Sequence, residues 1–372
     1  MRMHQRWFGA VLALFLAFAP ASVHAQERGF EGACAELEGG PVGTPCYVAA
    51  QAARSVAPQV ALLLTGGNPT IGTASTGGFR LRILPGVSAT AKVNLYGARM
   101  PDLREVRTSS TDAMSFGQLA FPTVSLSATG TVAVLPGSSI APTVGGIGAV
   151  DLLASATWVP LHALGDEGFH SGSAQVGFGA GARLGILRES FTTPGVALSL
   201  MYHRLGTVEW GEACPDGSIA ASRRGPGYTL EEGTCFLVDT GSTDPGTLGD
   251  FAFDLSGWSS RLAVSRHLRG LGLSAAVGYD RFSSDAEAGA RAPGSGEIIS
   301  TDAFARVRQV EFNEGRWMAS VGGSYSVLVT TFAAELGWMQ GGDALRGYPA
   351  SVSDFEPGDG IFFGSLGIRV AL

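Results

Sequence analysis

The chain has 372 residues and a formal net charge of −7; only 15% of its residues are charged, whereas 45% are hydrophobic. Soluble globular proteins carry about 25% charged residues, so this composition disfavours an ordinary water-soluble globule. The acidic balance disfavours nucleic acid as a partner, because a phosphate backbone attracts basic surfaces.

The first 25 residues have the parts of a secretory signal peptide: an arginine-containing start, an apolar run over 8–18, and a small-residue cleavage site that ends at Ala25. We therefore expect Sec-type export with cleavage near Ala25. No later stretch approaches the ~20 apolar residues of a spanning helix. An exported, apolar chain of this kind indicates a transmembrane β-barrel, because only helices and closed barrels satisfy their backbone groups in lipid.

Residues 26–75 read as a separate N-terminal segment. The stretch YVAAQAARSVAPQVALLL (47–64) predicts a short helix broken at Pro58, and GGNPTIGTASTGG after it predicts turns. We expect this segment to plug the barrel lumen or to cap it in the periplasm. A flexible lead-in remains a third interpretation.

Residues 76–372 repeat a two-residue alternation that predicts an all-β, antiparallel barrel. In VSATAKVNLY (87–96), for example, apolar residues occupy every odd position. The pattern predicts strands of about 12 to 18 residues, long compared with the ~5–6 usual in globular sheets. We expect about twelve strands, with ten to fourteen open: 79–84, 87–97, 122–134, 145–159, 172–188, 195–211, 250–267, 271–285, 299–313, 316–328, 330–341 and 360–372.

The polar strand faces and the tryptophans favour a membrane barrel over a soluble sandwich. Gly, Ser and Thr dominate the polar faces, with isolated charges rather than the Lys/Glu mixture of a solvated face. The five tryptophans beyond the signal peptide are expected on the apolar faces near one end, as an aromatic girdle. They are Trp158, Trp210, Trp258, Trp317 and Trp338.

Loop lengths suggest an orientation, since outer-membrane barrels keep short turns on the periplasmic side and long loops outside. We place 98–121, 160–171, 212–249 and 342–359 outside. One conflict remains: a full crossing by 299–313 would put the loops at 286–298 and 342–359 on opposite sides. Either that stretch is an extracellular excursion or 79–84 does not cross.

Four cysteines follow the signal peptide, and export to an oxidising compartment favours disulfides. Three pairings are possible. We favour Cys34 with Cys46 and Cys214 with Cys235, because each pair closes a short loop. A metal site is the weaker alternative, since no CxxC spacing occurs and no histidine is near either pair.

The last residues, SLGIRVAL, resemble the C-terminal assembly signal of bacterial outer-membrane β-barrels, with its pattern on Ser365, Gly367, Val370 and Leu372. That family usually ends in an aromatic residue, where this chain has leucine. The resemblance implies the bacterial outer membrane, with lipid around the barrel and the barrel assembly machinery as a partner of the final strand. In addition, GNP at 67–69 is similar to the plug segment of the long-chain fatty-acid transporter family.

Two motifs mimic enzyme signatures. DTGS at 239–242 matches an aspartic-protease loop, but such a protease needs two carboxylates that share a proton, and the chain has one copy. Asp239, Asp244 and Asp250 offer oxygen ligands for Ca²⁺, although a solvated loop is the simpler interpretation. GFGAGARLG at 177–185 fits a glycine-lined strand better than a dinucleotide site, because no helix follows it.

Ionisable residues on inward faces are the best functional signal, because charges at membrane depth must face water or each other. The lumen-lining candidates are Lys92, Asp151, Arg183, His203, Asp254, Glu335 and Arg369. Glu335 and Arg369 lie on consecutive strands and are expected to form an ion pair.

These features favour a channel or transporter for small solutes, gated by the N-terminal segment. A non-catalytic structural or adhesive barrel is the alternative, and a barrel-embedded lipid-modifying enzyme ranks below both. No serine motif accompanies His203, the inward histidine, so we expect no catalytic residue and no cofactor.

Overall fold

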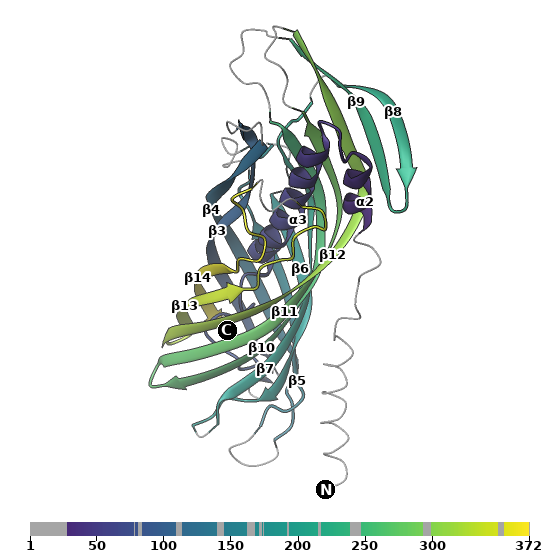
Figure 1. Cartoon of the computed structure of the whole chain (residues 1–372). Helices are drawn as coiled ribbons and strands as arrows, with labels where there is room; N and C mark the ends of the chain where they lie inside the picture. The colour runs from purple at the N-terminus through teal and green to yellow at the C-terminus, as the bar shows by residue number, and fades with distance from the viewer. Residues whose placement is uncertain are drawn as a thin grey trace.

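The computed structural model shows a single barrel of long antiparallel strands with a helix inside it (Figure 1). It describes residues 28–77, 79–80, 84–108, 114–139, 145–161, 168–170, 173, 175–191, 193–214, 217–238, 247–292, 299–348 and 353–371. The signal peptide and its cleavage site therefore lie outside the described residues.

Ten strands close the barrel, and the prediction of an all-β barrel with ten to fourteen strands is confirmed. The ring closes because the last strand pairs antiparallel with the first long one. In order around the ring, the strands are β3 (Val87–Thr108), β4 (Met114–Leu135), β5 (Ala149–Trp158), β6 (Val176–Leu187), β7 (Gly195–Trp210), β10 (Gly249–Leu268), β11 (Leu271–Arg291), β12 (Ile299–Val327), β13 (Thr330–Met339) and β14 (Ile361–Ala371).

The remaining strands lie off the ring. β8 (Gly217–Gly225) and β9 (Tyr228–Val238) form a hairpin that extends the sheet, because β9 pairs with the first part of β12. Figure 1 shows this hairpin at the top of the molecule. β1 (Phe79–Arg80) and β2 (Leu84–Pro85) pair only with each other.

Three details of the predicted strands are wrong. The stretch 79–84 does not cross, and 299–313 and 316–328 are one strand, β12, which continues past a bulge where Gln309 has φ +62°. The region 98–121 is mostly strand rather than loop, because β3 and β4 extend well beyond the expected crossing. With one continuous β12, the connections after β11 and after β13 fall at the same end. The conflict over sidedness therefore disappears.

The two ends of the barrel differ in their connections. Short connections at 188–194, 269–270 and 328–329 define what we call the turn end. The hairpin β8–β9 and the long 340–360 connection define the loop end. Both β3 and β14 meet the turn end, at residues 87 and 371.

The inside and outside of the barrel exchange polarity part-way along the strands, as β10 illustrates. Between the loop end and Trp258, the buried inner residues of β10 are Phe251, Phe253 and Leu255, and its outer face carries Asp254. On the other side of that level, Arg261 faces in, and the outer face carries Leu262, Val264 and Leu268, with Arg266 near the turn end. We call these parts the outer half and the membrane-level half.

The exposed tryptophans mark the boundary between the halves. Trp158, Trp258, Trp317 and Trp338 are 39–57% exposed on the outer face. Trp258 lies ten residues from the end of β10, which is roughly 33 Å of strand. At a tilt of about 40°, that length spans roughly 25 Å, the height of a lipid-facing apolar band.

Trp210 is an exception, and its predicted place in the girdle is wrong. It is 1% exposed and stacks on Phe251 inside the barrel, with ring centroids 5.4 Å apart. The pairing of β7 with β10 contains a bulge: Leu205 opposes Leu255 and Val208 opposes Phe253, so β7 has one more residue than β10 between these pairs. The extra residue reverses the facing of every later side chain in β7, since strand alternation has a period of two.

Helix α3 (Gly43–Thr65) fills the outer half of the lumen, and α2 (Arg28–Glu36) packs beside it and against β8, β9 and β12. Alanine-rich sequence favours the helix, which continues through Pro58 rather than breaking there. A proline inside a helix costs about 3 kcal/mol, and the burial of nearly every α3 side chain offsets that cost. Within the described residues, no helix has the length and hydropathy of a membrane span.

Candidate functional site in the barrel lumen

Residues 66–77, which we call the strap, leave the end of α3 and run through the membrane-level half toward the turn end (Figure 1). Gly66 ends the helix in a left-handed conformation (φ +37°), and its N–H donates to the Leu62 carbonyl (2.8 Å). Gly67 follows with φ +68°, and a Cβ there would lie 2.2 Å from Glu335 Oε1. Only glycine fits this bend, because it combines a left-handed backbone with contact to the wall.

Side chains of the barrel wall bind the main chain of the strap. Lys92 donates to the carbonyl oxygens of Gly66 and, at 3.4 Å, of Asn68. The Asn68 N–H donates to Glu335 Oε1 at 3.1 Å. Arg261 Nε donates to the Gly67 carbonyl at 3.2 Å. The wall charges therefore satisfy backbone groups that would otherwise be buried without partners.

The same pattern continues toward the turn end. Asp151 accepts from the Gly77 N–H (3.0 Å) and lies 3.6 Å from Arg183 Nε. Arg183 also donates to the Thr70 hydroxyl. Beside them lies a cavity of about 140 Å³, which Arg369 also lines. This cavity at the turn end has room for a few waters, given the ~30 Å³ share of one water.

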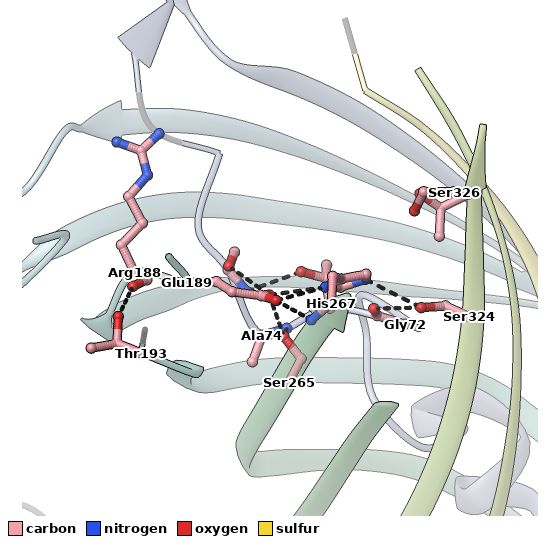
Figure 2. A network of polar contacts seen from close by, with 12 residues as sticks. Gly72, Ala74, Arg188, Glu189, Thr193, Ser265, His267, Ser324 and Ser326 are labelled. Atoms are coloured by element: carbon pink, nitrogen blue, oxygen red, sulfur yellow. Dashed lines mark hydrogen bonds and ion pairs between the residues drawn. The ribbon is translucent and has the colours of Figure 1, made fainter. Parts of the chain in front are cut away.

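Glu189, His267 and Ser324 form a chain of hydrogen bonds at the turn end (Figure 2). Glu189 follows β6, His267 is the second-last residue of β10, and Ser324 lies near the end of β12. His267 Nδ1 is 2.9 Å from Glu189 Oε2, and His267 Nε2 is 3.2 Å from Ser324 Oγ. This is the order of groups found in acid–base–nucleophile triads, with the base oriented by a third group.

The strap passes over this cluster. The Ser324 hydroxyl also contacts the Gly72 carbonyl (3.2 Å), and the Ala74 N–H donates to the Ser265 hydroxyl (2.8 Å). Ser265 in turn donates to Glu189 at 3.1 Å. Figure 2 shows Gly72 and Ala74 alongside the three residues. The cluster therefore lies beneath the strap.

Several wall hydroxyls in the membrane-level half have no hydrogen-bond partner within the described residues. Thr90, Ser127, Ser155 and Ser199 are examples. Buried polar groups usually have hydrogen-bond partners. This part of the wall therefore has hydroxyl groups that could form further hydrogen bonds beyond those made to the strap.

Not all of the predicted lumen residues lie where the alternation placed them. Lys92, Asp151, Arg183, Glu335 and Arg369 lie on the inner face, as described above. His203 is also inside, with Nε2 3.2 Å from the Ser259 hydroxyl, below the end of α3.

Two expectations about these residues are wrong. Asp254 is exposed on the outer face, where Thr207 donates to it at 2.6 Å; it shares a face with Trp258 because the two are four residues apart. The expected pair between Glu335 and Arg369 does not form. The register sets Glu335 opposite Ser365, four residues from Arg369 along the strand, which is about 13 Å.

The buried pair of Arg261 and Asp280 and the cluster around His267 were not among the residues predicted from the sequence. Strict alternation along β10 would have placed Arg261, Ser265 and His267 on one face, and that signal was available. The alternation could not show which residues pair with them, since Asp280 and Ser324 come from other strands.

Both predicted disulfides are confirmed: Cys34 bonds Cys46, and Cys214 bonds Cys235. Asp250, one of the three proposed calcium ligands, instead pairs with Arg306 at 2.7 Å. Asp239 and Asp244, with the DTGS motif, lie outside the described residues, as does Leu372. No group of three or more potential metal-ligating side chains occurs among the residues described.

No protein-family model and no curated protein matches the chain. Among solved structures, the outer-membrane protease OmpT of Escherichia coli is similar at 11% identity, over 77% of this chain and 97% of that one, with a TM-score of 0.36. The likeness is one of fold. The attachment invasion locus protein Ail of Yersinia pestis (7% identity, 77% and 99% covered, TM-score 0.25) and the outer-membrane phospholipase A of E. coli (9%, 76% and 95%, TM-score 0.27) are also similar. These neighbours are bacterial outer-membrane β-barrels of mixed function.

Proposed function

We propose that this chain is a closed barrel of the bacterial outer membrane that holds a rigid structure on the cell surface, in a structural or adhesive role. The turn end would face the periplasm and the loop end the outside, following the usual arrangement of such barrels. Outer-membrane lipid would cover the apolar band, and the barrel assembly machinery would recognise the final strand.

The observation that carries this proposal is the apolar packing of α3 in the outer half. Six of its aliphatic side chains are at most 5% exposed: Val48, Val56, Val60, Leu62, Leu63 and Leu64. Each contributes about 1.5–3 kcal/mol when buried, so displacing the helix would cost on the order of 10–20 kcal/mol. Thermally populated alternative states lie only a few kcal/mol above the ground state. Spontaneous gating by withdrawal of α3 is therefore disfavoured.

The space left beside α3 is also too small for solutes. Three cavities next to the helix measure about 30, 10 and 10 Å³. The 30 Å³ cavity matches a single water's share of liquid volume. The helix thus serves as the hydrophobic core of an extramembrane structure, to which the hairpin β8–β9 and two disulfides belong.

Gated passage of small solutes is the second candidate, and the unpaired wall hydroxyls favour it. The hydroxyl groups of wall residues such as Thr90 and Ser127 could form hydrogen bonds with water if the strap moved. The strap section 72–75 is held to the wall by three hydrogen bonds, from Ser324 and to Ser265 and Glu189, worth about 1 kcal/mol each. Movement of that section is thus much cheaper than movement of α3.

Planar-bilayer recording separates the two candidates. We expect no conductance steps from the full mature chain, because α3 stays in place. A deletion of 26–75 that still folds should conduct, since the polar membrane-level wall then lines an open lumen. Reproducible openings of the intact chain would contradict the closed-barrel proposal and favour the channel.

The adhesive role is tested on cells. Replacing 214–235 with a short Gly/Ser linker removes the hairpin and both of its cysteines together. We expect cells that express the full chain to attach to surfaces or to each other more than cells with the linker variant. Equal attachment, at equal surface amounts, would count against adhesion through the hairpin.

A further inference from the structure

The tautomer of His267 is set by its neighbours at the turn end. Both carboxylate oxygens of Glu189 lie within 3.0 Å of His267 Nδ1, and a carboxylate only accepts hydrogen bonds when ionised. In the neutral imidazole, Nδ1 therefore carries the proton, and Nε2 is the acceptor that faces Ser324 Oγ, 3.2 Å away; under the strap, the Ser324 hydroxyl donates to the Gly72 carbonyl. A neutral imidazole held in this way is a competent general base for a hydroxyl.

We propose that Ser324 is a nucleophile for acyl transfer from carboxylic esters, with His267 as its general base and Glu189 as the positioning residue. In the first step, the Ser324 oxygen bonds to the ester carbonyl carbon while His267 Nε2 takes the hydroxyl proton. The carbon–oxygen bond of the ester then breaks, and the leaving alcohol receives that proton. Water attacks the acyl-serine by the same route, releases the carboxylic acid and restores the serine.

The strap keeps this serine covered. A Cβ at Gly72 would lie 2.9 Å from the Cβ atoms of both Ser324 and Ala333, so the strap backbone passes directly over the nucleophile. Near the site, the cover is held by hydrogen bonds from Ser324 to the Gly72 carbonyl and from the Ala74 N–H to Ser265, and by a longer one (3.4 Å) from the Ser75 hydroxyl to Glu189. The site is therefore latent and opens when the 72–75 section shifts, while α3 remains in place.

The surroundings favour esters of membrane lipids. Phe191 and Leu328, at two turns of this end on either side of the 269–270 turn, are 91% and 98% exposed. Such apolar tips suit contact with the hydrocarbon edge of the adjacent leaflet, as interfacial anchors do. A lipid that enters at the turn end would bring its ester groups to the level of Ser324.

An alkyl fluorophosphonate tests the proposal, because an activated serine oxygen bonds to its phosphorus and expels fluoride. We expect labelling of the full chain in detergent, mapped to Ser324 by peptide mass spectrometry and lost in Ser324→Ala. His267→Gln should lower the labelling rate roughly a hundredfold or more. Ser326→Ala is the matched control, since Ser326 lies on the same strand and face and, among the described residues, its hydroxyl bonds only to Thr331 (3.0 Å); labelling of this variant should be unchanged.

Two further variants separate catalysis from a structural role. Gly72→Ala should speed labelling by pushing the strap off the serine. Glu189→Gln should shift the pH midpoint of labelling, whereas Ser326→Ala should not. Heat-modifiable migration in gels checks that each variant folds. Absence of labelling in both the wild type and Gly72→Ala, or labelling that persists in Ser324→Ala, would overturn the proposal and leave the cluster as a clasp for the strap. A nucleophilic Ser324 would differ from the expectation that the chain has no catalytic residue.

Discussion

Arg261 and Asp280 form an ion pair between β10 and β11 whose side chains are 1% and 0% exposed. Arg261 Nη2 lies 2.8 Å from Asp280 Oδ2, and its Nε donates to the strap at Gly67. The pair thus lies at the wall of the membrane-level half and joins two neighbouring strands to the strap. Its burial makes it sensitive to the loss of one partner.

Removal of Arg261 alone should be more damaging than removal of the pair. Arg261→Met leaves the Asp280 carboxylate buried without its partner, which costs about 3–5 kcal/mol. We expect the double variant Arg261→Met with Asp280→Leu to recover much of that loss. Urea unfolding in detergent micelles, followed by gel migration, measures both. Equal midpoints for the single and double variants would contradict the role of an uncompensated charge.

The level of the tryptophans is tested with two positions on one face of β10. Val264 lies in the apolar band, whereas Asp254 is exposed beyond Trp258 toward the loop end. Val264→Arg should destabilise the barrel by about 2–4 kcal/mol in lipid vesicles, as arginine does at the bilayer midplane. Asp254→Arg should change the free energy of unfolding by less than about 1 kcal/mol. Similar losses at both positions would place the boundary elsewhere.

Docking of α2 on the β8–β9 hairpin should weaken at high pH. The Tyr228 hydroxyl donates to Glu36, and burial, followed by that acidic partner, raises the pKa of Tyr228 from 10 to about 12. A raised pKa means that the stabilisation is complete below pH 10 and is lost as the pH rises through about 12. Protease sensitivity of α2, measured from pH 8 to 12.5, should increase over that window. Tyr228→Phe should remove the step, and a step of the same size in that variant would rule out this tyrosine.

The bend at Gly67 offers a paired test of close contact. Both Gly67 and Gly39 have positive φ (+68° and +86°), but a Cβ at Gly39 would meet nothing within 4 Å. Alanine at either position has a left-handed cost of roughly 1–2 kcal/mol. Gly67→Ala should lose more, because its methyl group collides with Glu335 and displaces the strap. Amide hydrogen exchange at Asn68 reports the displacement, and unchanged exchange there would contradict the wall contact.

The fold was predictable where the period-two pattern was uninterrupted. The stretch 87–96 lies in β3 with its alternate faces as expected, because a strand without bulges preserves its facing. Prediction failed where one residue was inserted: the bulge before Trp210 turned that side chain inward. It also failed at 314–315, where a break was predicted and β12 continues without one. A bulge leaves no clear signal in a single sequence.

The candidate site was predictable only as separate residues. Lys92 and Glu335 could be placed in the lumen, but their common contact with the strap depends on where residues 66–77 pass. His267 and Ser324 are 57 residues apart in the chain. Their approach follows from the registers of β10, β11 and β12.

The sequence by itself determined that this chain forms a barrel with an apolar outer band, because alternation and composition are local properties that each strand carries alone. Only the tertiary structure decided that the barrel closes with ten strands, that α3 occupies its outer half, and that polarity reverses at the tryptophans. Those outcomes depend on strand register and on which segment fills the lumen. Both are settled by contacts between residues far apart in the chain.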